Sequence, residues 1–153
     1  MVDVTFSVNG KEHSLSVNDN ALLSETLRES LNLTGTHIGC DTSQCGSCTV
    51  HLDGKAVKAC TVLTAQAAGS EVTTIEGIGE PGSLHPMQEA FNEHHALQCG
   101  FCTPGMIMAA IGLVNESESL DGDGVRKGLD GNFCRCTGYH NIVKAVLSAQ
   151  QNM

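Results

Sequence analysis

The number and spacing of the cysteines constrain this chain more than any other feature of its sequence. The eight cysteines fall into two groups of four, with none left over. The first group has three cysteines on one short loop and a fourth further along, in the pattern C-x4-C-x2-C-x11-C: Cys40, Cys45, Cys48 and Cys60. The second group consists of two close pairs, in the pattern C-x2-C-x31-C-x-C: Cys99, Cys102, Cys134 and Cys136. Each group can bring four thiols to one place.

The spacing of the first group is typical of a plant-type [2Fe–2S] site. Three thiols on one loop can converge on a cluster, and the fourth thiol comes from a neighbouring predicted strand. Gly39 and Gly46 suit a loop whose amide N–H groups turn toward bridging sulfides, because glycine accepts backbone angles that a Cβ forbids. The two groups together predict two iron–sulfur clusters and a protein that transfers electrons.

The residues alone leave other roles open for the cysteines. A C-x2-C pair is also half of a zinc site, although zinc rarely needs three closely spaced ligands. Eight cysteines could form a disulfide framework, but residues 1–10 show no signal peptide and a reducing compartment favours metal ligands. The segment Cys45-Gly46-Ser47-Cys48 could be a thioredoxin-type redox pair, but a strand-like segment follows it instead of a helix.

The histidines are not needed as ligands. Rieske-type ligation would replace two cysteines on one iron with histidines, but cysteines already fill both sites. We therefore expect His51, His85 and the other histidines to be ordinary surface or helix residues. Arg135, between two cysteines, could offset cluster charge, pair across an interface or be a solvated surface residue.

Charge and composition exclude several classes of function. The net charge is −9 with scattered acids, and 8 Lys and Arg residues form no basic stripe, which disfavours nucleic-acid binding. Aromatic residues make up only 3% of the chain, so each small core is expected to be aliphatic and stapled by a cluster. No apolar run is long enough for a membrane span. We therefore expect a cytoplasmic protein without membrane insertion.

The N-terminal part predicts an α+β domain over residues 1–76. Apolar and polar residues alternate in several segments, and Asn9-Gly10 and Asp53-Gly54 are hairpin turn signals. The predicted strands are residues 2–8, 13–17, 48–52, 55–60 and 71–75. A helix over residues 21–31 has its leucines on one face, and Asn20 is its expected cap. These elements suit a β-grasp, ferredoxin-like module.

The C-terminal part predicts a four-helix bundle over residues 84–153, after a glycine-rich linker at 77–83. Thr103 is expected to cap the second helix, which opens with Pro104. Glycines dilute the third helix, around residues 125–129, so we expect it to be short or frayed. Each cysteine pair precedes a helix, and helix N-termini favour anions. The second cluster is therefore expected to lie between two helix N-termini, buried in the bundle.

Three segments carry a family resemblance: GCDTSQCGSCT at residues 39–49, QCGFCTPG at 98–105 and CRCTGY at 134–139. With them, nearly the whole chain resembles the small iron–sulfur subunit of the molybdenum hydroxylases, the xanthine oxidase family. The stretch 37–61 looks most like the small subunit of aerobic carbon monoxide dehydrogenases. Similar small subunits serve enzymes that act on aldehydes and N-heterocycles.

The resemblance implies an assembly with two further subunits, expected as a dimer of heterotrimers. A large subunit would hold molybdenum on molybdopterin cytosine dinucleotide, and a medium subunit would hold FAD. The cluster on Cys99, Cys102, Cys134 and Cys136 would lie nearer molybdenum, and the other cluster nearer the flavin. Gln98 matches a residue whose amide contacts the pterin, and Cys136 matches a ligand near the pterin edge.

No nucleophile–base pair and no phosphate-binding loop is evident in this sequence. The chain is therefore expected to carry electrons for a catalytic partner and to transform no substrate itself. The alternative is a free-standing ferredoxin with two clusters. The substrate of the whole enzyme, whether carbon monoxide, an aldehyde or an N-heterocycle, would be decided on another chain.

Overall fold

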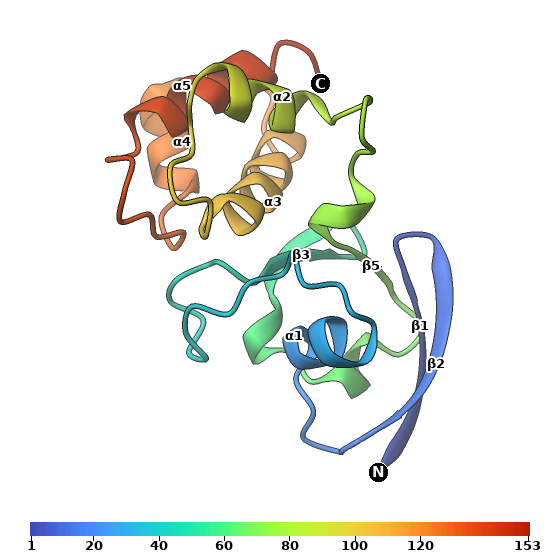
Figure 1. Ribbon diagram of the computed structural model, residues 1–153. Helices are drawn as coiled ribbons and strands as arrows, with labels where there is room; N and C mark the ends of the chain where they lie inside the picture. The colour runs from blue at the N-terminus through green and yellow to red at the C-terminus, as the bar shows by residue number, and fades with distance from the viewer.

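The computed structural model describes residues 1–153 as a five-stranded sheet unit lying against a unit of four helices (Figure 1). The strands are β1 Val2–Val8, β2 Lys11–Val17, β3 Thr49–Leu52, β4 Lys55–Lys58 and β5 Glu71–Thr73. The main helices are α2 Pro86–Glu93, α3 Thr103–Asn115, α4 Gly122–Gly128 and α5 His140–Ala149. Shorter helical segments are α1 Leu23–Glu25, η1 Thr26–Ser30, η2 Ala59–Thr61, η3 Thr64–Ala67 and η4 Ile75–Gly77. The predicted α+β class is confirmed.

The sheet has the strand order β2-β1-β5-β3-β4, so the last strand in sequence lies at its centre. β1 runs parallel to β5, whereas β1–β2, β3–β5 and β3–β4 are antiparallel. Both predicted hairpin turns are present, and Asn9 and Asp53 have left-handed φ angles of 52° and 49°. The predicted alternation on β1 is also correct, because Val4, Phe6 and Val8 are all buried. β5 therefore joins two hairpins into one sheet.

The helix expected over residues 21–31 is shorter than predicted, and it begins two residues later. It begins at Leu23 and continues as the wider turns of η1, so Asn20 does not cap it, contrary to our expectation. The reason is tertiary. Leu23 N donates to Val62 O at 2.8 Å, and Thr64 N donates to Ala21 O at 2.8 Å. These bonds hold residues 21–22 extended, and the Glu25 carboxylate instead accepts the Leu22 amide at 3.3 Å.

The helical unit contains the four predicted helices, but its caps differ from the sequence expectation. Thr103 is the first residue of α3 rather than its cap, and its hydroxyl is buried without a partner. His85 caps α2 by accepting the Met87 amide at 3.1 Å, and Asp121 caps α4 by accepting the Gly124 amide at 2.7 Å. α4 is short, as predicted, but it begins at Gly122, three residues before the predicted segment 125–129, and ends at Gly128. None of the helices has the length and apolar character needed to cross a membrane.

Helix α3 joins the two units by packing directly on the β3–β4 hairpin (Figure 1). A Cβ at Gly105 would stand 2.8 Å from Ser47 Cα, and one at Gly112 would stand 3.0 Å from the Ala56 Cβ. His51 is buried on β3 and its Nε2 donates to the Met108 carbonyl of α3 at 2.8 Å. The expectation that His51 is an ordinary surface or helix histidine was wrong, because strand β3 lies beneath a helix of the other unit.

We expect Gly105→Ala to weaken the contact between the two units. The added methyl would meet backbone atoms of Gly46 and Ser47, which cannot rotate away. Overpacking of this kind costs about 1–3 kcal/mol, so the Tm should fall.

Gly122→Ala is the matched control, since its Cβ would meet the flexible end of Arg126 at 3.2 Å and would make an ordinary van der Waals contact with Val143 at 3.8 Å. That change should leave the Tm unchanged or raise it. Thermal unfolding of the iron-loaded variants, followed by circular dichroism, makes the comparison. Equal Tm values for the two variants would contradict the close contact at Gly105.

Candidate iron–sulfur sites

The β3–β4 hairpin brings together the two buried cysteines of the first group. Cys48 lies directly before β3 and Cys60 lies in η2, directly after β4. Thr49 pairs with Lys58 in the hairpin, and Cys60 N lies 3.5 Å from Cys48 Sγ. We expected Cys60 on a strand, but β4 ends at Lys58 and the chain turns there. This turn directs the Cys60 amide toward the sulfur of Cys48.

The other two cysteines of the first group face each other across the loop that precedes β3. Cys40 and Cys45 are half-buried, and Cys45 N donates to Cys40 Sγ at 3.4 Å. Hydrogen bonds from the amides of Cys45 and Thr42 lower the pKa of the Cys40 thiol to about 6. Burial, in contrast, raises the pKa of the Cys48 thiol to about 12. The loop therefore stabilises the thiolate of the half-buried Cys40, whereas burial disfavours the thiolate of Cys48.

The second group also consists of two facing pairs. Cys99 Sγ and Cys136 Sγ lie 3.5 Å apart. Burial and the neighbouring Cys134 thiol raise the pKa of Cys102 to about 12. Burial also acts to raise the pKa of Cys134, but the Thr137 hydroxyl, which donates to Cys134 Sγ at 3.1 Å, helps to bring it below its usual value.

The paired arrangement fits a two-iron cluster in both units. A [2Fe–2S] cluster is held by four thiolates, two on each iron, so its ligands need to approach only in pairs. A zinc ion would need four ligands around one point, and no three His, Cys, Asp or Glu side chains are gathered that closely. Amide and hydroxyl groups that donate to sulfur also suit an anionic cluster. The residues present therefore fit the predicted cofactor better than they fit zinc.

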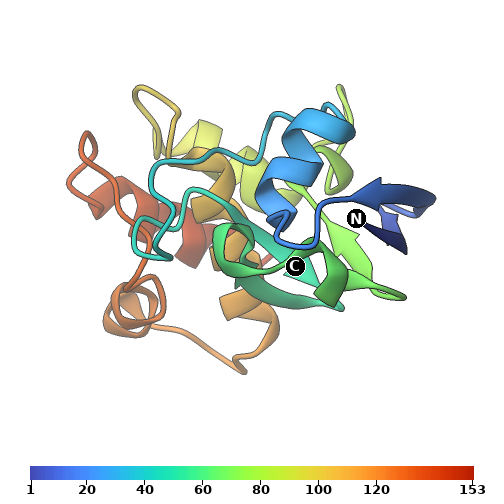
Figure 2. The same ribbon diagram turned by 90° about the horizontal axis from the view of Figure 1, so that it is seen from below.

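The second group is not buried in the bundle, and that expectation was wrong for half of its cysteines. Cys134 is buried, but Cys99 and Cys136 are exposed. Only Cys102 adjoins a helix, as the residue before α3, whereas α5 begins at His140, after Tyr139 in a left-handed conformation with φ 67°. The two loops extend past the helix ends, on the same side of the molecule as the first cysteine loop (Figure 2). Cys99 and Cys136 are therefore open to solvent in this chain.

Two exposed phenylalanines lie beside the exposed cysteines, and each has a polar side chain stacked against its ring. Phe101 and Phe133 are 48% and 50% exposed. The His37 ring stacks on Phe101 with centroids 4.8 Å apart, and its Nδ1 donates to the Phe101 carbonyl at 2.7 Å. Arg135 lies over the Phe133 ring at 5.3 Å. Gln98 is exposed next to Cys99. Gln98, Cys99, Cys136 and the two phenylalanines thus belong to loops that a partner could cover.

Direct hydrogen bonds connect the first cysteine loop, residues 40–48, to the segment just before Cys134. The cysteine spacing could not reveal this connection. Phe133 N donates to the Cys45 carbonyl at 2.8 Å. Asn132 Nδ2 donates to Gly46 O at 3.2 Å and to Gly105 O at 3.3 Å. The two candidate sites are therefore fixed to each other. Phe133, the residue before Cys134, is hydrogen-bonded directly to Cys45.

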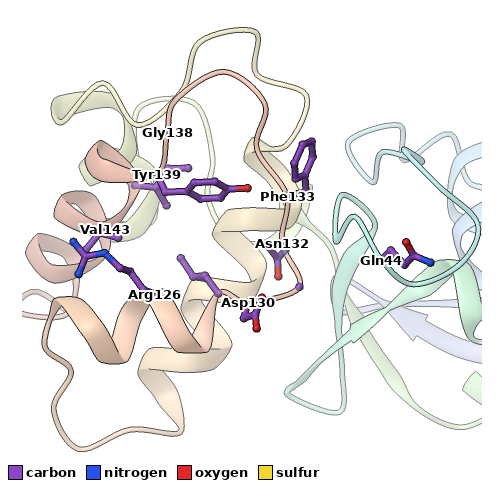
Figure 3. Close-up of a pocket in the computed structure, with 11 residues that line it drawn as sticks. Gln44, Arg126, Asp130, Asn132, Phe133, Gly138, Tyr139 and Val143 are labelled. Atoms are coloured by element: carbon purple, nitrogen blue, oxygen red, sulfur yellow. The ribbon is translucent and has the colours of Figure 1, made fainter.

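A cleft of about 630 Å³ lies beside the second cysteine group, between α4, α5 and the segment 129–133 (Figure 3). Arg126 of α4 and Val143 of α5 lie on its walls. Tyr139 also lines it, and its hydroxyl accepts the Cys134 amide at 2.8 Å. None of the eight cysteines lines the cleft. The cleft therefore adjoins the candidate cluster site without being part of it.

Comparison with known proteins agrees with this geometry. Residues 6–74 match the family model of the 2Fe-2S iron-sulfur cluster binding domain, and residues 74–147 match that of the [2Fe-2S] binding domain. The chain is 46% identical, over 95% of its length and 92% of the relative's, to the 6-hydroxypseudooxynicotine dehydrogenase complex subunit beta of Paenarthrobacter nicotinovorans. The chain belongs to the small [2Fe–2S] subunits of the molybdenum hydroxylases, the xanthine oxidase family.

Solved structures show that this small subunit has the fold of its relatives. Quinoline 2-oxidoreductase from Pseudomonas putida 86 superposes with a TM-score of 0.94 at 39% identity, covering 98% of this chain and 94% of that chain. The aldehyde oxidoreductase from Desulfovibrio gigas superposes with a TM-score of 0.93 at 46% identity, but there the match covers only 17% of a longer chain. The predicted β-grasp and helical domains and the electron-transfer role are confirmed. The domain boundaries 1–76, 77–83 and 84–153 stay predictions.

In the iron-free small subunit, we expect Cys40 to react with iodoacetamide at neutral pH well before Cys102. The Cys40 thiol has a pKa of about 6, so its reactive thiolate increases through that pH and the rate levels off above it. Cys102, with a pKa of about 12, stays a thiol until much higher pH. Peptide mapping by mass spectrometry after timed alkylation measures both rates. Equal rates at pH 7 would contradict the lowered pKa of the Cys40 thiol.

Proposed function

We propose that this subunit passes electrons from a molybdopterin site on a large partner subunit to FAD on a medium partner subunit. Cys99, Cys102, Cys134 and Cys136 would bind the cluster nearer molybdenum, and Cys40, Cys45, Cys48 and Cys60 the cluster nearer the flavin. Each cluster, when bound, would accept and release one electron at a time. The hydrogen bond from Phe133 N to the Cys45 carbonyl carries this proposal, because it connects the two ligand loops directly.

The exposure of two cysteines of the second group supports the assignment of this group to the molybdenum side. Cys99 and Cys136 lie at the surface among exposed phenylalanines, where a partner subunit could approach them closely. Gln98 is exposed in the same loop, so its amide is free to reach a pterin held by that partner. The donation from Thr137 to Cys134 Sγ would stabilise negative charge on this cluster. These residues would thus position and tune the cluster without taking part in substrate chemistry.

The partners and the substrate remain proposals. Relatives are named as subunits beta and gamma or as small subunits, which supports a multisubunit complex, and we propose a dimer of heterotrimers in the cytoplasm. Relatives include a nicotine 6-hydroxylase subunit, a caffeine dehydrogenase subunit and an aldehyde oxidoreductase subunit. We therefore propose an N-heterocycle or an aldehyde as substrate of the whole enzyme. Carbon monoxide, suggested by residues 37–61, is the third candidate.

Gentle purification of the chain from its host tests the proposal. We expect it to copurify with two larger chains, molybdenum, FAD and about four iron atoms per small subunit. Assays of that complex with nicotine, an aldehyde and carbon monoxide would then identify the substrate class. A lone 16.0 kDa iron protein without molybdenum or flavin would instead favour the free-standing ferredoxin. Half of the second group is exposed, so copurification and not cluster burial separates the two alternatives.

We expect Cys102→Ser to abolish reduction of the flavin by substrate in the purified complex. The change removes one of four thiolates of the second site, while Cys40, Cys45, Cys48 and Cys60 lie in the other unit. The spectrum of the first cluster should therefore persist. Rapid-mixing absorbance of the flavin, with electron paramagnetic resonance (EPR) of the clusters, measures both effects.

Cys48→Ser is the reciprocal control and should remove the spectrum of the first cluster instead. It should block flavin reduction as well, but it should still allow the second cluster to be reduced by substrate. Normal flavin reduction in the Cys102→Ser complex would contradict the proposed route.

A further inference from the structure

Lys58 is the only charged side chain that is hydrogen-bonded both to the first cysteine loop, residues 40–48, and to the segment just before Cys134. It is the last residue of β4 and is half-buried. Its Nζ donates to the Ser43 carbonyl at 2.8 Å, within the first cysteine loop. It also donates to the Gly131 carbonyl at 2.7 Å, three residues before Cys134. One ammonium group therefore connects the two candidate cluster sites.

The charge of Lys58 has no acidic partner in this chain. The ion pairs of the structure are Met1 N-terminus with Asp19 and Arg126 with Asp123, both at the surface. Lys58 instead has only two carbonyl oxygens as partners. Partial burial of an ammonium without an opposite charge is unfavourable unless negative charge lies nearby. The cysteines of the two groups are candidates for that negative charge, since Lys58 stands two residues before Cys60 and is hydrogen-bonded to Ser43, in the loop of Cys45.

We propose that Lys58 is a positioning residue for electron transfer, which fixes the two cluster loops together and stabilises the reduced state of both clusters through its positive charge. The inference rests on the ligand assignment under the proposed function. One added electron makes a cluster one unit more negative, and a nearby fixed cation favours that change. Net charge around a cluster is one of the factors that set its reduction potential.

Three substitutions separate the charge of Lys58 from its hydrogen bonds. Lys58→Gln removes the charge but keeps an amide donor, whereas Lys58→Arg keeps both the charge and several donors. Lys55→Gln is the matched control, because Lys55 begins the same strand and is exposed. We expect Lys58→Gln to reduce the equilibrium constant for reduction roughly tenfold, which corresponds to a fall of about 59 mV for a one-electron couple. Lys58→Arg and Lys55→Gln should leave the midpoint potentials at the wild-type values.

A fourth variant tests the charge with Lys58 left in place. Ala56 is exposed and stands two residues before Lys58, on the same face of β4. Both residues line one shallow hollow beside α3. Ala56→Glu would put a carboxylate next to the ammonium and offset its charge. The midpoint potentials should then fall in the same direction as in Lys58→Gln. This variant leaves the Lys58 side chain itself unchanged, so it remains informative if Lys58→Gln fails to retain iron.

Redox titration followed by EPR, on complexes purified with their partner chains, measures the midpoint potential of each cluster. Lower potentials in Lys58→Gln and Ala56→Glu, with unchanged potentials in Lys55→Gln, would support the proposal. Unchanged potentials in Ala56→Glu, or a fall in Lys58→Arg as large as in Lys58→Gln, would overturn it. Two [2Fe–2S] signals in the wild type test the ligand assignment separately. Their absence would overturn the proposed function, and their presence with unshifted variants would overturn only the role of Lys58.

Discussion

The backbone contact between the two cysteine loops is the constraint on which the rest of this structure depends. Gly105 at the start of α3 lies so close to Gly46 and Ser47 that no side chain fits between them. Asn132 donates to Gly46 and Gly105 at that point, and Phe133 donates to Cys45. The sheet unit and the helical unit are thereby held at a fixed separation. These contacts therefore also fix how the two candidate cluster sites lie relative to each other.

The two cysteine groups show the same contrast in thiol pKa, with one pKa lowered and another raised in each group. The first loop lowers the pKa of Cys40 through amide donors, whereas burial raises the pKa of Cys48 and of Cys102. Thr137 supplies a hydroxyl donor to Cys134 in the second group. Each group therefore combines a thiol stabilised as thiolate with a thiol that burial keeps protonated in the absence of metal. Metal binding would have to displace the proton from the buried thiols, which couples cluster assembly to the protein environment.

The cysteine pattern was sufficient to predict the candidate ligands, and the alternation of apolar and polar residues with helical periodicity predicted the α+β class, because both are patterns that can be read along the chain. The hairpin turns at Asn9-Gly10 and Asp53-Gly54 were predicted for the same reason. The helix starts were less predictable. Asn20 and Thr103 have the side chains of good caps, but pairing with residues 62–64 holds the chain extended after Asn20, and α3 begins one residue before its expected start. Tertiary contacts outweighed local preference after Asn20, whereas at α3 the cap position falls on Cys102.

The sequence by itself determined which residues could bind iron, the two-domain organisation and the kind of complex to which the chain belongs. Only the tertiary structure decided how the two sites are related. The hydrogen bonds of Lys58 and Asn132 join residues that are 73 and 86 positions apart, and no periodicity or spacing encodes such pairs. The structure also showed that Cys99 and Cys136 are exposed rather than buried. Exposure depends on where loops end relative to their neighbours, which is a property of the folded chain and not of any segment within it.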